Sequence, residues 1–138
     1  MSAKNIIRFL IIPAAVLIAF IAVFYSVDSE TNSTNIKYIN SCRWQVEERC
    51  ADISYITNPE EFDAVFSAYN DIIKEGGFDL TPYKGMRTVR YTYIVTNHPD
   101  SDSRLIRINI IVCKDKIISA DISSLAQNGF IEPLIQSE

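Results

Sequence analysis

Apolar residues are concentrated at the start of the chain, where Phe9–Tyr25 forms an uncharged run of 17 residues. A helix of that length spans roughly 25 Å, and including residues 6–8 brings it to about 30 Å, the thickness of a bilayer's hydrocarbon core. Lys4 and Arg8 precede the run, whereas acidic residues follow it. Because a positive flank stays in the cytoplasm, residues 1–25 predict a cytoplasmic N-terminus and a transmembrane signal-anchor, with the rest of the chain outside.

The alternative for this segment is a signal peptide that is cleaved. Its apolar region would normally hold about 7–15 residues and end in a small-x-small cleavage site. Here the bulky Phe24 and Tyr25 end the run, so an uncleaved single-pass anchor in the cell membrane is the favoured interpretation. Residues 26–35 are polar without apolar periodicity and predict a flexible stalk. Residues 36–138 then form the extracytoplasmic domain.

One long amphipathic helix is predicted over Pro59–Glu75 in this domain. Asn58 is a good N-cap, Pro59 suits the first helical position, and Glu61 completes a capping box. Gly76-Gly77 ends the helix. The apolar side chains that recur at the spacing of one helical face are Phe62, Val65, Phe66, Tyr69, Ile72 and Ile73.

Alternating apolar and polar residues predict strands on both sides of this helix. The short candidates, after a short helix at 35–41, are residues 44–47 and 52–57. The longer strands are 88–96, 105–113 and 116–122, and Lys114-Asp115 joins the last two as a hairpin. One apolar and one polar face indicate an antiparallel sheet covered by a helix on one side. We therefore expect an α+β fold, with three to five antiparallel strands packed by one main amphipathic helix and residues 125–135 folding back over the sheet.

Charge separates the two parts of the chain further. The 138 residues carry a net charge of −4, but those after residue 25 hold 11 basic and 17 acidic side chains, a net charge of −6. This balance argues against nucleic-acid binding, which requires a basic surface. The expected partners are the lipid bilayer, through residues 6–25, and an envelope protein or a cell-wall component.

The polar face of the predicted sheet carries the best candidates for a binding site. Arg90 and Thr92 project from one strand and Arg107 and Asn109 from the next, and Asp121 joins them if the register of the third strand allows it. Two guanidinium groups with an amide can bind a carboxylate or an acidic loop of a partner. The favoured alternative is a solvated face stabilised by cross-strand pairs.

Other residues offer weaker chemistry. His98 is the only histidine and no cysteine is near it in sequence, so no metal site is expected. The loop Asp100-Ser101-Asp102-Ser103 lacks the glycine of a calcium loop. Since the sequence contains neither a nucleophile elbow nor a phosphate loop, we expect no catalytic residues and no cofactor.

Three cysteines leave two interpretations open. Outside the membrane, Cys42 and Cys50 are spaced to close a small disulfide loop, which would leave Cys113 unpaired. In the alternative, all three are reduced and act as small apolar fillers.

Several short stretches occur in an order and spacing typical of one family. They are Pro59-Glu60-Glu61-Phe62-Asp63, Tyr69-Asn70, Gly77-Phe78-Asp79-Leu80, Tyr83, Gly85, Arg90-Tyr91-Thr92-Tyr93, Val95, Asn97, Pro99, Arg107, Asn109, Val112, Asp121 and Gly129-Phe130. Over roughly residues 36–134 the chain resembles the bacterial domain of unknown function 4830, found mainly in Firmicutes proteins with an N-terminal membrane or secretion segment. The resemblance implies no established activity, so no catalytic residue is carried over.

The chain departs from that family at three places. Arg43 stands where the family tends to have glycine before the tryptophan. Lys114-Asp115 replaces an Asn-Gly-like turn, and Ser119-Ala120-Asp121 replaces Gly-Gly-Asp. The hairpin turn and the close backbone packing are the features that these departures put in question.

Three functions are compatible with these patterns. The favoured one is a non-enzymatic interaction or sensing module, held at the bacterial cell envelope by one membrane helix. The second is a small envelope enzyme that uses Asp121 with the arginines. The third is a structural accessory subunit of a membrane complex.

Overall fold

The computed structural model describes residues 18–19 and 29–136. The chain divides into two units, Met1–Ser33 and Thr34–Glu138, and the second is described below. The predicted membrane segment, residues 6–25, lies outside the described residues except for residues 18–19. In the described part, no helix is both long enough and apolar enough to cross a bilayer.

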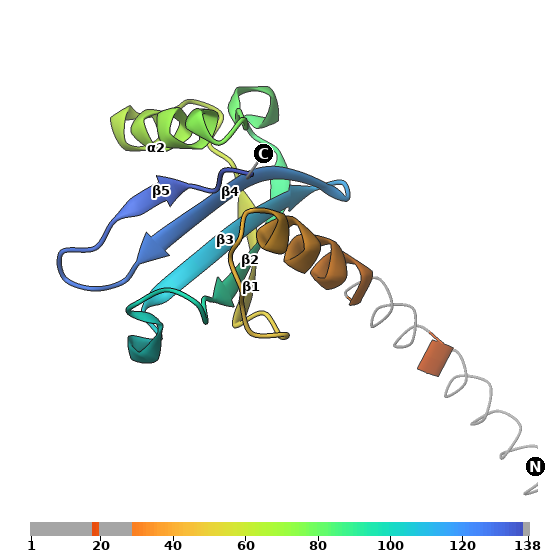
Figure 1. Ribbon diagram of the computed structural model, residues 1–138. Helices are drawn as coiled ribbons and strands as arrows, with labels where there is room; N and C mark the ends of the chain where they lie inside the picture. Colours follow the sequence, from red (N-terminus) through yellow and green to blue (C-terminus); the bar gives the residue numbers. More distant parts are fainter. Residues whose placement is uncertain (1–17, 20–28, 137–138) are drawn as a thin grey trace, which may run out of the picture. The chain divides into compact units, whose positions relative to one another are not determined.

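A five-stranded antiparallel sheet is the centre of the second unit (Figure 1). Its strands follow one another in sequence order, and each pairs with the next along the chain. They are β1 (Asp52–Thr57), β2 (Arg87–Ile94), β3 (Ile106–Cys113), β4 (Lys116–Ser124) and β5 (Ile131–Pro133). The predicted α+β class and antiparallel sheet are confirmed, and the tail folds back as the short edge strand β5.

The predicted strand at residues 44–47 is wrong. Only Val46 pairs with the sheet, through an isolated bridge to Val95. Arg43, just before this segment, has a positive φ of 65°, and the chain leaves the preceding helix through a turn there. The alternation of apolar and polar residues over 44–47 is too short to distinguish a strand from the irregular segment that follows the turn at Arg43.

The hairpin between β3 and β4 forms as predicted, with Lys114-Asp115 as its turn. Lys114 and Asp115 have positive φ values of 48° and 63°, the left-handed conformation that a two-residue type I′ turn requires. A β-bulge between Ile111 and Val112 shifts the register of β4. Because of this shift, Ile118 packs in one cluster with Ile111 and Cys113.

Residues 29–41 form a helix, so the predicted flexible stalk is wrong for residues 29–35. Ile36 and Ile39 pack against the sheet, and the Asn35 side-chain amide donates to the Tyr93 hydroxyl (3.1 Å). Once such packing has formed the first turns, each further residue adds to a helix at little cost. The helix therefore continues into polar residues that have no apolar pattern of their own.

The second helix, α2, spans Ala64–Glu75 and starts five residues later than predicted. Its N-cap is Asp63, whose carboxylate accepts from the Phe66 N–H (2.7 Å). Asn58 bonds elsewhere: its backbone N–H donates to Met86 and its side chain to the Tyr83 carbonyl. Both Asn58 and Asp63 are residue types that favour an N-cap. Because Asn58 is held by its bonds to Tyr83 and Met86, Asp63 caps the helix.

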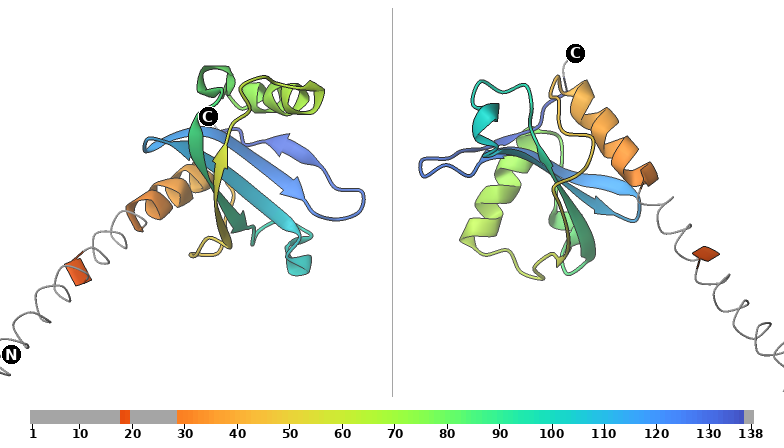
Figure 2. Two further views of the ribbon diagram at one scale, coloured as in Figure 1. Left: turned by 180° about the vertical axis from the view of Figure 1, so that it is seen from behind. Right: turned by 90° about the horizontal axis from the view of Figure 1, so that it is seen from below.

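Both faces of the sheet are covered, which corrects the prediction of cover on one side. The more apolar face packs against residues 34–41 and the C-terminal segment, whereas α2 covers part of the other face (Figure 2). The first cluster contains Ile39, Tyr91, Tyr93, Ile108, Ile110, Ala120, Ile122 and Leu134. The second contains Leu80, Ile111, Cys113 and Ile118, with Phe62, Phe66 and Tyr69 packed on it.

Two short 3₁₀ helices complete the unit. One spans Thr81–Tyr83 after α2, and the other spans Ser101–Ser103 in the loop between β2 and β3. The first follows Leu80, which is fully buried. The second lies inside the polar stretch Asn97–Ser103, whose composition predicts a turn.

Candidate functional site

Three of the five predicted polar-face residues form one row across the sheet. The register places Thr92 opposite Asn109, and Asn109 opposite Asp121. The Thr92 hydroxyl donates to the Asn109 side-chain oxygen (2.9 Å), and the Asn109 amide donates to Asp121 Oδ1 (2.9 Å). The register of the third strand thus brings Asp121 into the predicted set.

Asp121 is the most enclosed member of the row, with 3% of its surface exposed. Its second carboxylate oxygen accepts from the Tyr69 hydroxyl of α2 (2.8 Å). Burial raises the pKa of Asp121, while bonds from Asn109 and Tyr69 and the charge of Arg90 act in the opposite direction. Burial also raises the pKa of Tyr69, and the neighbouring Asp121 carboxylate adds to that effect. Both protons are therefore held more tightly than in water.

The two arginines lie outside this row. Arg90 is exposed and stands between Ser54 and Ile111 in the register. Arg107 is half-buried beside Ser123, and its Nε is buried without a hydrogen-bond partner among the described residues. In the described part neither guanidinium forms an ion pair. The register thus gives the two arginines different cross-strand neighbours, and binding of one ligand by both stays a prediction.

Sequence reasoning missed three residues of the network. The Tyr69 hydroxyl also lies 3.1 Å from Ser119 Oγ, and the Asn109 amide reaches Ser123 Oγ at 3.3 Å. Ser119 and Ser123 are buried, which contradicts the expectation of a solvated face. Polar residues at 119, 121 and 123 repeat with the period of a strand, so this signal was available. Tyr69 was hidden because it belongs to the apolar stripe of α2.

His98 has a structural role. Its ring stacks on Trp44 with centroids 5.8 Å apart and contacts Phe130 at 6.1 Å. Its Nδ1 accepts from the Asp100 N–H (3.1 Å). Among the residues that the structure describes, no cluster of three metal-ligating side chains occurs. The loop around Asp100 is therefore organised by ring packing and local hydrogen bonds.

Cys42 and Cys113 are buried free thiols, and Cys50 is half-buried. Cys42 follows the first helix and packs in the larger apolar cluster. Burial raises the pKa of the Cys42 thiol, against hydrogen bonds from Tyr38 and Ser41. A protonated, enclosed thiol is a poor partner for disulfide exchange. The structure thus has Cys42 as an apolar filler, and an oxidised Cys42–Cys50 form stays a prediction.

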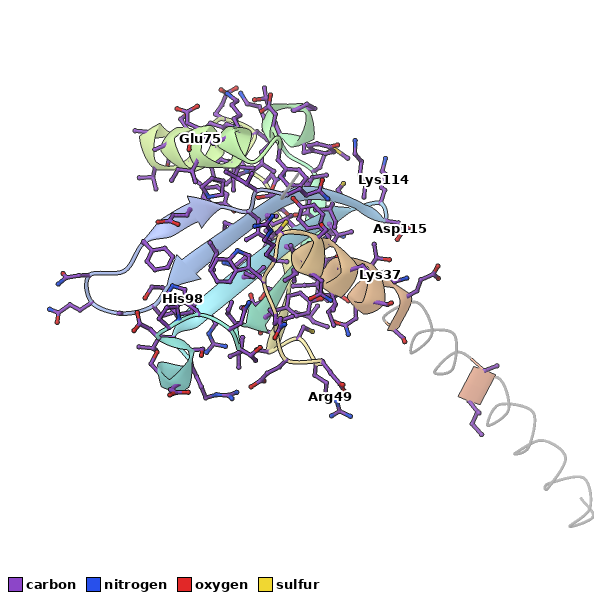
Figure 3. The ribbon with its side chains drawn as sticks, viewed as in Figure 1. Lys37, Arg49, Glu75, His98, Lys114 and Asp115 are labelled. Atoms are coloured by element: carbon purple, nitrogen blue, oxygen red, sulfur yellow. The ribbon has the colours of Figure 1, made fainter. Side chains whose placement is uncertain are left out.

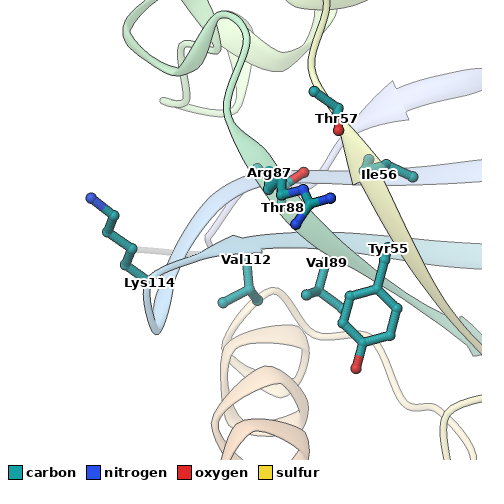
Figure 4. Close-up of a pocket in the computed structure, with 8 residues that line it drawn as sticks. All are labelled: Tyr55, Ile56, Thr57, Arg87, Thr88, Val89, Val112 and Lys114. Atoms are coloured by element: carbon teal, nitrogen blue, oxygen red, sulfur yellow. The ribbon is translucent and has the colours of Figure 1, made fainter.

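A pocket of about 430 Å³ opens at the end of the sheet where β1 and β3 end and β2 begins (Figure 4). Figure 3 shows Lys114 and Asp115 at the tip of the neighbouring hairpin. The pocket is lined by Tyr55, Ile56, Thr57, Arg87, Thr88, Val89, Val112 and Lys114. None of the residues predicted from the sequence as binding candidates belongs to it.

Comparisons with known proteins give a family and no activity. No curated protein and no solved structure matches the chain. The family match agrees with the resemblance expected from the residues of the helix and the strands. Its sequence model covers residues 24–122, most of the chain, and the protein therefore belongs to the family described as Domain of unknown function (DUF4830).

Proposed function

We propose that the protein is a single-pass membrane protein whose Thr34–Glu138 unit is an interaction module outside the cytoplasm of a bacterium. The observation that carries the proposal is the uncharged run Phe9–Tyr25, with Lys4 and Arg8 before it and acidic residues after it. Seventeen uncharged residues extended by a snorkelling arginine suffice for a membrane span. The charge difference across the run favours a cytoplasmic N-terminus.

The tether between the run and the second unit is short. Only residues 26–33 separate Tyr25 from the unit that begins at Thr34. Because residues 29–33 belong to the helix over residues 29–41, which rises about 1.5 Å per residue, this segment reaches at most about 20 Å. An anchored module would therefore meet partners close to the membrane surface, such as other membrane proteins or the innermost layer of the cell wall.

The polar network supports an interaction module over the envelope-enzyme alternative. That enzyme would need Asp121 and the two arginines at one accessible site. Asp121 is buried, and both of its oxygens accept hydrogen bonds from protein groups. In this position the carboxyl group of Asp121 joins α2 to the sheet through its hydrogen bonds to Tyr69 and Asn109. The pocket beside β1, which Arg87 and Lys114 help to line, is a surface that a partner can reach without displacing this network.

Fusion of alkaline phosphatase after Glu138 tests the topology. The proposal predicts phosphatase activity outside the cytoplasm and a fusion protein that stays in the membrane pellet after alkaline carbonate extraction. The matched control exchanges Lys4 and Arg8 for glutamate, which removes the positive flank and should lower the exported fraction. Recovery of the fusion in the soluble exported fraction would mean that the segment is cleaved, and an inactive fusion would place the domain inside.

A further inference from the structure

β1 is the edge of the sheet and its outer side is open. The Asn58 N–H, just after β1, donates to the Met86 carbonyl on the β2 side. In an antiparallel pair, successive residues direct their backbone groups alternately toward the partner strand and away from it, so the register of β1 and β2 shows which residues of β1 face β2. The N–H and C=O groups of Ile53, Tyr55 and Thr57 therefore point away from β2. No backbone hydrogen bond involving these outward groups occurs in the part of the chain that the structure describes.

This edge lacks the usual protection against strand pairing. Edge strands are commonly blocked by lysine, proline or a bulge, and β1 has none of them. Tyr55, in the middle of the strand, is 78% exposed, and Ile53 is exposed beside it. An open edge with large apolar side chains is a surface to which another strand can add.

The pocket adjoins the C-terminal half of this edge. Tyr55, Val89 and Val112 stand side by side in the register of β1, β2 and β3 and form its apolar wall (Figure 4). Arg87 and Lys114 add two positive charges. Neither cation forms an ion pair with another described residue. Two unpaired cations in a part of the chain that is acidic overall indicate an anionic ligand.

We propose that β1 and this pocket bind an extended acidic segment of a partner protein, which adds as a sixth strand. The proposal rests on the function proposed above, since it names the partner of the interaction module. The partner's backbone pairs with Ile53, Tyr55 and Thr57. Its alternate side chains face the pocket, where an apolar one covers Tyr55 and Val89 and a carboxylate reaches Arg87 and Lys114.

Charge favours such a partner over a second copy of this chain. The only charged residue of β1 is Asp52. Asp52 and Tyr55 project from opposite faces because side chains alternate along a strand. Symmetric antiparallel pairing of two β1 strands keeps each face on its own side, so Asp52 of a second copy would not reach the cations. A second copy therefore leaves Arg87 and Lys114 without a counter-charge.

Fluorescence anisotropy on the full chain in detergent micelles tests the proposal. The probes are fluorescein-labelled decapeptides of alternating threonine and valine that end in three glutamates or in three lysines. We expect the glutamate peptide to bind at least about tenfold more tightly, and the Arg87→Ala and Lys114→Ala variants each to weaken it about tenfold, as expected for one charge-assisted hydrogen bond. The matched control, Arg49→Ala, removes an exposed cation before the other end of β1 and should leave binding unchanged.

Strand addition is tested separately from charge. Tyr55→Pro removes an outward N–H and leaves the bonds to β2 in place, which is the edge position where proline is tolerated. It should abolish binding. N-methylation of alternate amides of the glutamate peptide should abolish it too, and this change cannot unfold the protein.

Three results would overturn the proposal: equal binding of the two peptides, full binding of the N-methylated peptide, or a dimer in sedimentation that Tyr55→Pro dissociates. These outcomes are independent of the topology assay. If the domain is anchored and exported but does not bind the peptides, only the proposal of an acidic partner segment is refuted. Peptide binding by a domain that the phosphatase fusion places inside would refute the location alone.

Discussion

Tyr69→Phe is the sharpest test of the network beneath α2. The change removes one hydroxyl and keeps the ring, so it deletes the bond to Asp121 (2.8 Å) and the contact with Ser119 (3.1 Å) without opening a cavity. A hydrogen bond to a charged group contributes about 1.5–3 kcal/mol, and a neutral one about 0.5–1.5 kcal/mol. Because Asp121 and Ser119 are both buried, water does not replace the lost donor. We expect the free energy of unfolding to fall by about 2–4 kcal/mol at neutral pH.

The cost of Tyr69→Phe should depend on pH. The pKa of Asp121 is raised in the folded protein, so its protonated form contributes stability that is complete below the unfolded pKa and is lost as pH rises through the folded pKa. Tyr69 is a donor that stabilises the carboxylate. Removing it raises the pKa of Asp121 further, so the free-energy difference between the variant and the wild type grows as pH rises from acid to neutral.

Urea unfolding of the full chain in micelles, followed by the fluorescence of the single tryptophan, Trp44, measures this cost. Tyr55→Phe is the matched control, because the side chain of Tyr55 is exposed at the sheet edge and such a change alters stability by about 0.5 kcal/mol or less. If Tyr69→Phe costs no more than Tyr55→Phe, or costs the same at acid and neutral pH, the structural role assigned to Asp121 is wrong.

Three further predictions concern groups outside this network. Asn70→Ala should lower the free energy of unfolding by about 1–3 kcal/mol, read from the urea midpoint, because the buried Asn70 oxygen accepts from the Leu80 N–H (2.8 Å) and no other acceptor replaces it. Hydrogen bonds from Thr81 and Asn70 lower the pKa of Asp79 to about 2. The stability that this low pKa contributes is present above the unfolded pKa and is lost as pH falls toward 2. NMR titration should therefore show a pKa of about 2 for Asp79. Asp79→Asn should make the free energy of unfolding depend less on pH in this range. In native protein, Cys42 should react with iodoacetamide more slowly than Cys50, because it is buried and its pKa is raised; a native mass lower by two hydrogens would instead reveal the disulfide.

The regular part of the sheet could be predicted from the sequence. Each long strand alternates apolar and polar residues, and the observed ranges of β2 and β3 differ from the predicted ones by at most two residues at either end. Lys114-Asp115 was also recognised as a turn, since a connection of only two residues leaves few alternatives. These features depend on local patterns, which a single sequence contains.

Features that depend on tertiary packing were missed or misplaced. The start of α2 moved from Pro59 to Ala64 because Asn58 bonds to the loop at Tyr83 and Met86. The helix over residues 29–41 extends into polar positions because its other end packs on the sheet. The residues that make these bonds and contacts are distant in sequence, so no local pattern near either helix indicates them.

The candidate site shows the same division. Alternation placed Thr92, Asn109 and Asp121 on one face, and the register confirms that they meet. Alternation along the strands could not show that α2 covers this face, because the apolar stripe of a helix does not indicate which side of a sheet it packs against. The pocket beside β1 combines residues from three strands, and only their register brings Tyr55, Val89 and Val112 together.

Hydrogen exchange of the full chain, with and without the glutamate peptide, tests whether a partner adds as a strand at β1. The outward amides of β1, at Ile53, Tyr55 and Thr57, should exchange quickly in the free protein, since no bond to β2 protects them. We expect the peptide to slow the exchange of these amides and to leave the exchange of the amides around Asn109 and Asp121 unchanged. Protection at the polar face instead, or no protection anywhere in β1, would contradict it.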